Sequence, residues 1–272
     1  MKSILKSSGG MTLVEVLIAL LMTGILTAAM FRVYVNQHHA WMIQDRVIEM
    51  QQNARAAADE LARQLRMAGY ELPNNLPPIV AFDTNPDTIY IHYQSAGCSA
   101  PIDKTMPQPS SELDCTGPTA DVSCFYVGQE AYIFDPNLEA GEFFPISHVQ
   151  VTPGKIQHNT QKLSKCYPKG SIILALDRIK YYVDQSDTLH PKLMVQLGSF
   201  DPQVYAEDIV DLQFDYVMKN GDTVDVPGIA KDVRAIGITV QSRTPQKDVE
   251  FTATPYRYET YQSRVYLRNM GT

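Results

Sequence analysis

Four cysteines are the residues with the clearest chemical potential in this sequence, either as metal ligands or as disulfides. They are Cys98, Cys115, Cys124 and Cys166. No two of them show the C-x₂₋₄-C spacing that is typical of zinc sites. In an exported domain an even number of cysteines predicts disulfides, and four cysteines allow three connectivities. We expect Cys98–Cys115 and Cys124–Cys166, because the long segment 95–121, which is poor in apolar residues, then has a tether.

Histidines and acidic residues in the same part of the chain show no catalytic pattern. The sequence contains no HExxH, GxSxG, GxxxxGK, GxGxxG or EF-hand motif. Scattered histidines are more often structural than catalytic, and here they are His92, His148, His158 and His190. The pairs Asp83/Asp87 and Asp184/Asp187 are typical of turns, with calcium binding as the alternative. We therefore expect no enzyme, no resident metal and no cofactor.

Glu15 is a carboxylate within an otherwise apolar segment. From Met11 to Val35 the only other charged residue is Arg32. As a helix this segment reaches roughly 37 Å, enough to cross a hydrocarbon core of about 30 Å. A carboxylate inside hydrocarbon costs about 2.5–3.5 kcal/mol. Glu15 therefore lies at the headgroup boundary, or it pairs with a positive charge from a neighbouring subunit, for which a new amino terminus at Met11 is the nearest candidate.

The segment before this helix predicts its orientation. Residues 1–10 contain Lys2 and Lys6 and no acid, so the N-terminus is expected to stay in the cytoplasm and the chain beyond Val35 to be exported. In an ordinary secretory signal the small residues follow the apolar run, whereas here they precede it. Cleavage after Gly10 would leave the apolar helix on the mature protein.

The same helix is predicted to continue to about Ala68. Apolar residues recur at steps of three and four: Ile43, Val47, Met50, Ala54, Ala57, Leu61, Leu65 and Ala68. Gly69, followed by Pro73, predicts the end of the helix. We expect the apolar stripe to pack on a sheet of the same chain, with a coiled coil with a partner as the alternative.

After Pro73 the apolar residues alternate with polar ones, which predicts strands with one buried face. Such runs lie at 88–93, 123–127, 131–135, 143–151, 172–183, 193–198, 209–218, 233–242 and 261–267. Alternation of this kind is typical of antiparallel sheets. The sequence thus predicts an α+β fold, in which a long N-terminal helix, half transmembrane and half amphipathic, packs on an antiparallel β-sheet head.

The charge of the whole chain disfavours nucleic acid as a partner. The 272 residues include 23 Lys and Arg against 30 Asp and Glu, a net charge of −7. Nucleic-acid binding requires a basic surface that displaces counterions from phosphates. No nucleic-acid contact is predicted.

The start of the apolar segment resembles the class III leader junction of type IV pilins and type II secretion pseudopilins. The residues that carry the resemblance are Gly10, Met11, Thr12, Leu13, Val14 and Glu15. Phenylalanine is the commonest residue of the family at the position of Met11. The resemblance implies that a prepilin peptidase cleaves between Gly10 and Met11 and N-methylates Met11. It also implies that Thr12 and Glu15 dock the helix onto an adjacent subunit.

Later segments extend the resemblance to most of the chain. Five of these segments are similar to the PilW type of minor pilin, which is related to J-type pseudopilins. They are QNARAAADELARQLRMAGY, LDRIKYYVDQSDTLHPKLMVQ, AEDIVDLQFDYVMKNGD, VRAIGITVQSRT and YLRN. This implies a leader at 1–10, a transmembrane helix at 11–35, an amphipathic periplasmic helix at 36–69 and a β-rich periplasmic head at 70–272.

The same resemblance implies a place and a set of partners for the protein. It predicts a single-pass protein of the bacterial inner membrane that later enters the pilus, in an initiation or tip complex. Its partners would be the prepilin peptidase, other minor pilins, the major pilin, the inner-membrane assembly platform and membrane lipid. Two alternatives are a J-type pseudopilin of type II secretion and a membrane-anchored periplasmic enzyme or binding module.

Overall fold

The computed structural model describes residues 10–94, 97–117, 121–158, 162–248 and 255–270. The chain divides into two compact units, Met1–Ile48 and Glu49–Thr272. One helix, α1 (Leu13–Met67), begins in the first unit and ends in the second. The predicted α+β class is confirmed, because this helix is combined with antiparallel sheets.

In the first unit, α1 presents an apolar surface that no described part of the chain covers. An 18-residue window of the helix has a mean hydropathy of 2.2, and 0% of it is buried. The helix is therefore long and apolar enough to cross a membrane. Its observed bounds differ from the predicted helix, Met11 to Ala68, by two residues or fewer at each end.

The helix ends where the sequence predicts. Gly69 has a φ of +83°, the left-handed conformation that commonly terminates helices. The Gly69 N–H donates to the carbonyl of His92 at 3.0 Å, so the end of the helix is also attached to a strand. A Cβ at this position would lie 3.0 Å from Met270 Cγ and 3.2 Å from the Asn269 carbonyl oxygen, so a side chain here would require its neighbours to shift.

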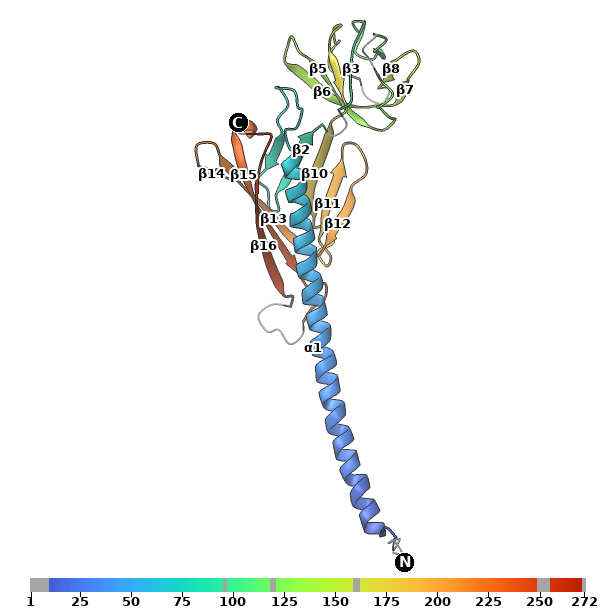
Figure 1. The fold of residues 1–272 in the computed structure, drawn as a ribbon, viewed down its shortest axis with the longest axis vertical. Coiled ribbons are helices and arrows are strands. Elements are labelled where there is room, and N and C mark those ends of the chain that lie inside the picture. The colour runs from blue at the N-terminus through green and yellow to red at the C-terminus, as the bar shows by residue number, and fades with distance from the viewer. Residues whose placement is uncertain (1–9, 95–96, 118–120, 159–161, 249–254, 271–272) are drawn as a thin grey trace, which may run out of the picture. The chain divides into compact units, whose positions relative to one another are not determined.

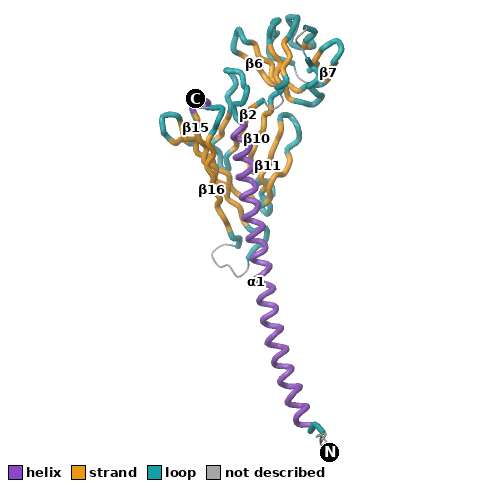
Figure 2. The backbone as a smooth tube through the Cα atoms, viewed as in Figure 1, coloured by secondary structure: helices purple, strands orange, loops and turns teal. Residues whose placement is uncertain are grey.

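The second unit contains two antiparallel sheets that pack on the last turns of α1 (Figures 1 and 2). One sheet has the order β1-β2-β10-β11-β12, with bounds Ile79–Phe82, Thr88–Tyr93, Asp177–Asp184, Lys192–Leu197 and Gln203–Glu207. The other has the order β14-β13-β15-β16, with bounds Thr223–Val224, Ile209–Met218, Val233–Arg243 and Tyr258–Tyr266. A short 3₁₀ helix, Ala230–Asp232, precedes β15.

The buried face of the helix explains how it fits against both sheets. Ala54, Ala57 and Ala58 are almost fully buried, and these small residues let the backbones approach closely. Leu61 and Leu65 are 0% exposed and fill the core together with side chains from both sheets. Packing on the chain's own sheets is therefore confirmed for the stripe from Ala54 to Ala68, whereas Ile43 and Val47 are only partly buried and are not part of this core.

An inserted lobe, residues 94–176, separates two neighbouring strands of the first sheet. Tyr93 of β2 and Asp177 of β10 are register partners, so the lobe leaves and rejoins the sheet at one point. We call the remainder of the second unit the base. The lobe has its own core, which includes Ile102, Leu113 and Phe144. In Figure 1 its strands form a separate group, coloured green to yellow.

The lobe contains two small antiparallel sheets. The first has the order β3-β9-β5-β6, with bounds Ser99–Pro101, Ile172–Leu174, Glu130–Asp135 and Ala140–Pro145. The second has the order β4-β8-β7, with bounds Leu113–Asp114, Lys155–Gln157 and His148–Gln150. Where the lobe meets the base, Leu76 packs against Tyr132 and Leu176, and Asn75 Nδ2 donates to the Tyr132 hydroxyl at 2.6 Å.

Several predictions for the lobe are wrong. The segment 95–121, for which no strand is predicted, contains β3 and β4. The segment 123–127 is not a strand: Ser123 N–H bonds the Asp121 side chain, and Gly128 turns the chain with a φ of +86°. The runs 143–151 and 172–183 are each divided between two strands of different sheets.

Candidate functional site

The start of α1 forms a capping box between Thr12 and Glu15. The Thr12 backbone N–H donates to Glu15 Oε2 at 2.9 Å, and the Thr12 hydroxyl donates to the same oxygen at 3.1 Å. In return the Glu15 N–H donates to Thr12 Oγ1 at 3.3 Å. Such reciprocal bonds satisfy backbone donors that a helix start leaves without partners. The T-x-x-E spacing is the sequence signal for this motif, and the sequence analysis missed it.

The capping box uses only one of the two carboxylate oxygens. Oε2 accepts both bonds from Thr12, whereas Glu15 Oε1 has no hydrogen-bond partner among the described residues. The carboxylate is thus held in a defined orientation with one oxygen available. Because the Thr12 N–H is an amide donor whether or not the chain is cut before Met11, the box does not depend on the leader.

The predicted cleavage junction is exposed in the described structure. Met11 is 71% exposed, and a Cβ at Gly10 would meet nothing within 4 Å. The fold therefore does not require glycine at position 10. The predicted leader residues Lys2 and Lys6 lie outside the described residues.

The surface around Glu15 is apolar. Leu13, Val14 and Leu17 are each more than half exposed. An uncovered apolar surface of this kind requires lipid or another apolar helix as its surroundings. A carboxylate held beside it would be stabilised by a cationic group.

The structure corrects the predicted disulfide pairs. Cys98 and Cys124 form a disulfide with a Cα–Cα distance of 6.0 Å, so both predicted pairs, Cys98–Cys115 and Cys124–Cys166, are wrong. Cys98 precedes β3 and Cys124 lies in the turn before β5, and these strands belong to the same sheet. Cys115 instead follows β4 of the other sheet, where its N–H donates to the Gly154 carbonyl at 2.8 Å.

The two remaining cysteines are free thiols in different surroundings. Cys115 is buried, and burial raises the pKa of its thiol to about 12. Cys166 is exposed. Because the thiolate is the reactive form of cysteine, Cys115 is unreactive in the folded protein and Cys166 is accessible.

The four histidines do not form one cluster, although His148 and His158 are near neighbours because His148 pairs with Gln157 of β8. His92 is buried, its Nδ1 lies 2.7 Å from the Pro77 carbonyl, and burial lowers the pKa of its imidazole. His158 Nε2 lies 2.9 Å from the Ser111 carbonyl. His190 Nδ1 lies 3.5 Å from Asp208 Oδ1, and His148 is exposed in β7. The structure does not bring these four residues together.

Three of these four acidic residues, Asp87, Asp184 and Asp187, accept hydrogen bonds within turns, as predicted, and Asp87 also binds a backbone N–H of β13. Asp87 accepts the Phe214 N–H at 2.8 Å and the Thr84 N–H at 3.1 Å. Asp184 accepts the Ser186 N–H and Asp187 accepts the Leu189 N–H, each at 2.9 Å. Among the residues that the structure describes, no group of three or more His, Cys, Asp and Glu side chains is placed to hold a metal ion.

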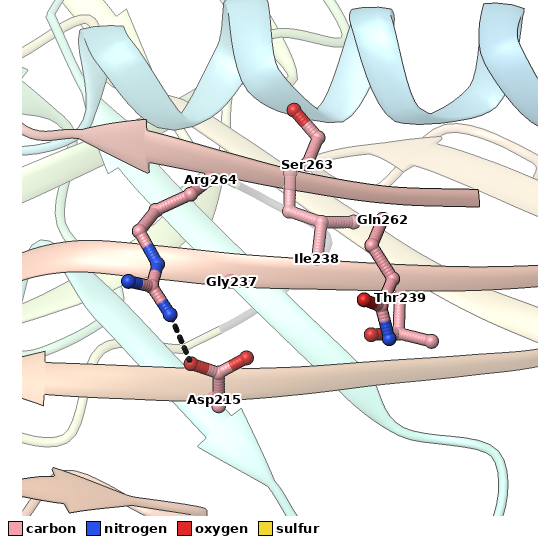
Figure 3. Close-up of a pocket in the computed structure, with 7 residues that line it drawn as sticks. All are labelled: Asp215, Gly237, Ile238, Thr239, Gln262, Ser263 and Arg264. Carbon is pink, nitrogen blue, oxygen red and sulfur yellow. Dashed lines mark ion pairs between the residues drawn. The ribbon is translucent and has the colours of Figure 1, made fainter.

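A groove of about 340 Å³ lies on the polar face of the β13-β15-β16 sheet (Figure 3). Asp215, Gly237 and Arg264 face one another across the three strands, and Arg264 Nη2 lies 4.0 Å from Asp215 Oδ2. The groove exists because Gly237 has no side chain between them. The ionisable side chains in its described lining are Asp215 and Arg264, which face each other across the groove.

No protein-family model matches the chain, and no curated protein matches it. The feature with the most specific arrangement is the N-terminal segment, where an exposed junction, a capping box and an uncovered apolar helix follow one another within a few residues.

Proposed function

We propose that this protein is a minor pilin of the PilW type that takes part in type IV pilus assembly, in an initiation or tip complex with other minor pilins. The observation that carries the proposal is the Glu15 carboxylate, oriented by Thr12 at the start of an apolar helix that its own chain leaves uncovered. A simple membrane anchor could cap its first turn with an uncharged side chain and has no need of a carboxylate charge beside hydrocarbon.

The Glu15 carboxylate carries its charge next to an apolar medium. An unpaired carboxylate in hydrocarbon is costly, whereas a carboxylate paired with a cation recovers much of that cost. The free Oε1 of Glu15 is suited to accept the amino group of a neighbouring subunit while Oε2 remains in the capping box. Assembly would then supply the partner that the isolated chain lacks.

The proposed function also includes processing of the N-terminus. A prepilin peptidase of the inner membrane would cleave between Gly10 and Met11 and methylate the new amino terminus. The head would lie in the periplasm, where the Cys98–Cys124 disulfide is compatible with the oxidising conditions. The assembly platform would then extract the helix from lipid and pass it to the other pilins.

The proposal is tested by expressing the chain with and without prepilin peptidase in a strain that lacks its own copy. Intact-mass analysis should show loss of residues 1–10 and gain of one methyl group, only when the peptidase is present. The mature chain should also occur in sheared pili. A Gly10→Ala variant is the matched control, since Gly10 has no steric role in the fold. It should fold, insert and remain uncleaved.

Retention of the leader in the presence of active peptidase would contradict the processing. Correct cleavage combined with absence from sheared pili, and with pili in normal number when the chain is missing, would contradict the role in assembly.

A further inference from the structure

A second carboxylate with an unused oxygen lies inside the head. Glu130 begins β5 and is 7% exposed. Its Oε1 accepts two hydrogen bonds, from Arg178 Nη2 at 2.6 Å and from Ser199 Oγ at 3.2 Å. Its buried Oε2 has no hydrogen-bond partner among the described residues. A buried acceptor without a donor is costly and indicates a missing ligand or solvent molecule.

A small cavity adjoins this carboxylate where the inserted lobe meets the base. Its volume is about 30 Å³, and its lining includes Tyr126, Gln129, Glu130, Arg178, Gly198 and Phe200. Gly198 has a φ of +49°, and a Cβ there would lie 3.2 Å from Glu130 Oε2. Glycine therefore keeps open the space beside the unused oxygen. The volume suits a group the size of a water molecule or an ammonium ion.

The charge around the cavity favours a cation. Among the described lining residues, Arg178 is the cationic side chain, and it bonds Glu130 Oε1 and not Oε2. Burial raises the pKa of Glu130 even though Arg178 lies beside it. One guanidinium thus does not fully compensate the buried carboxylate.

Two exposed aromatic rings border the same cavity. Tyr126 is 56% exposed and Phe200 is 46% exposed. Gly128 brings the turn of Tyr126 close to the Phe200 ring, since a Cβ on this glycine would lie 3.5 Å from Phe200 Cε1. Aromatic faces bind cations and the methylene stems that carry them.

We propose that this cavity binds a primary ammonium group on an apolar stem, supplied by a lysine side chain of a partner protein. The ammonium would donate to Glu130 Oε2, and the stem would lie between Tyr126 and Phe200. A water molecule would satisfy Oε2 but leave both rings exposed. A sugar hydroxyl would cover the rings but bring no charge. This site lies wholly in the second unit and does not depend on the role of the N-terminal segment.

The test uses the full chain in detergent micelles and saturation-transfer NMR. The main probe is Nα-acetyl-lysine N-methylamide, and its neutral counterpart is Nα,Nε-diacetyl-lysine N-methylamide. Butylamine, Nα-acetyl-arginine N-methylamide and methyl glucoside represent a free amine, a guanidinium and a sugar. The variants are Glu130→Gln, which keeps the shape and an acceptor for Arg178, and Phe200→Ala, which leaves the carboxylate intact. Tyr266→Ala, at a 71% exposed position on β16, is the matched aromatic control.

We expect the lysine probe to bind at least about tenfold more tightly than its acetylated form, because the charge-assisted hydrogen bond is lost on acetylation. Glu130→Gln should weaken binding about tenfold, Phe200→Ala about threefold, and Tyr266→Ala not at all. Equal binding of the charged and acetylated probes, or unchanged binding by a folded Glu130→Gln variant, would overturn the proposal. Tighter binding of butylamine, of the arginine probe or of methyl glucoside would assign the cavity to a free amine, a guanidinium or a sugar, and would overturn it as well.

Discussion

Tyr93 and Asp177 lie opposite each other as the terminal register pair of β2 and β10, although the whole inserted lobe separates them in the chain. The two strands are therefore neighbours in the sheet without being joined by a tight turn. Each side of this junction has its own core, one around α1 and one within the lobe. The head consists of two sheets packed on the helix, and a small β structure is inserted into the first of them.

This relationship predicts that the lobe is dispensable for folding of the base. Replacing residues 94–176 by Asn-Gly should join β2 and β10 as a hairpin and preserve the helix–sheet core. Leu76 would lose Tyr132 and Arg178 would lose Glu130, so the melting temperature should fall by about 5–10 °C. Circular dichroism of the detergent-solubilised protein during heating checks this. Loss of cooperative unfolding would show that the base depends on the lobe.

A second prediction separates the two roles of Glu15. Gln at this position keeps the capping box without the charge, whereas Ala removes both. If docking needs the charge, both variants should insert and be cleaved normally but be reduced in sheared pili at least about tenfold. Thr12→Ala breaks the box and keeps the charge, so it should be incorporated better than either. Incorporation of Glu15→Gln at the wild-type level would show that the carboxylate only caps the helix.

Labelling of free thiols tests the Cys98–Cys124 disulfide. The native chain should react with a maleimide at Cys166 alone, because Cys115 is buried with a pKa of about 12. The denatured, unreduced chain should show two reactive thiols, Cys115 and Cys166, while Cys98 and Cys124 stay oxidised. Cys166→Ser is the control and should abolish native labelling. A denatured chain without reactive thiols would indicate a second disulfide that the structure does not contain.

Two glycines in the sheets, Gly141 and Gly237, are expected to differ in how much stability is lost when each is replaced by alanine. In Gly141→Ala the new Cβ would overlap the Ile133 backbone carbonyl and the Tyr132 ring, so the free energy of unfolding should fall by about 1–3 kcal/mol. In Gly237→Ala the Cβ would meet the Asp215 carboxylate, an exposed side-chain end that can rotate away. The expected loss there is below about 1 kcal/mol. Chemical denaturation of both variants checks the order, and equal losses would contradict it.

Glu60 predicts a pH dependence of the contact between α1 and the first sheet. Burial opposes ionisation of Glu60, but hydrogen bonds from Gln64 and Arg63 outweigh it, and the pKa of Glu60 is lowered. Gln64 in turn accepts the Tyr93 hydroxyl at 2.8 Å, which links this group to the sheet. A carboxyl whose pKa is lower in the folded state than in the unfolded state stabilises the fold at pH values above its unfolded pKa, near 4.3. This stabilisation is lost as the pH falls through the folded pKa.

The measurement is the melting temperature of the wild type and of Glu60→Gln between pH 7 and pH 3. The wild type should be the more stable protein at pH 7, and the difference should shrink as the pH falls below about 4.5. A difference that is constant over this range would show that Glu60 acts only through packing.

Sequence and tertiary structure determine different features of this protein. The period of the apolar residues predicted α1 and its buried stripe, and Gly69 with Pro73 predicted its end, because a helix is held by bonds between residues four apart. Alternation likewise predicted the long base strands such as β13 and β15, whose two faces have different surroundings. These features depend on residues that are close together in the sequence.

The partners of each strand and side chain are decided by contacts between distant residues. The short strands of the lobe carry too few residues to show a period, so β3, β4 and β8 were not predicted. The Cys98–Cys124 bond follows from which strands share a sheet, and the unused oxygen of Glu130 follows from the meeting of β5 with Arg178 of β10. Such proximity depends on how the elements pack, and sequence spacing alone does not contain it.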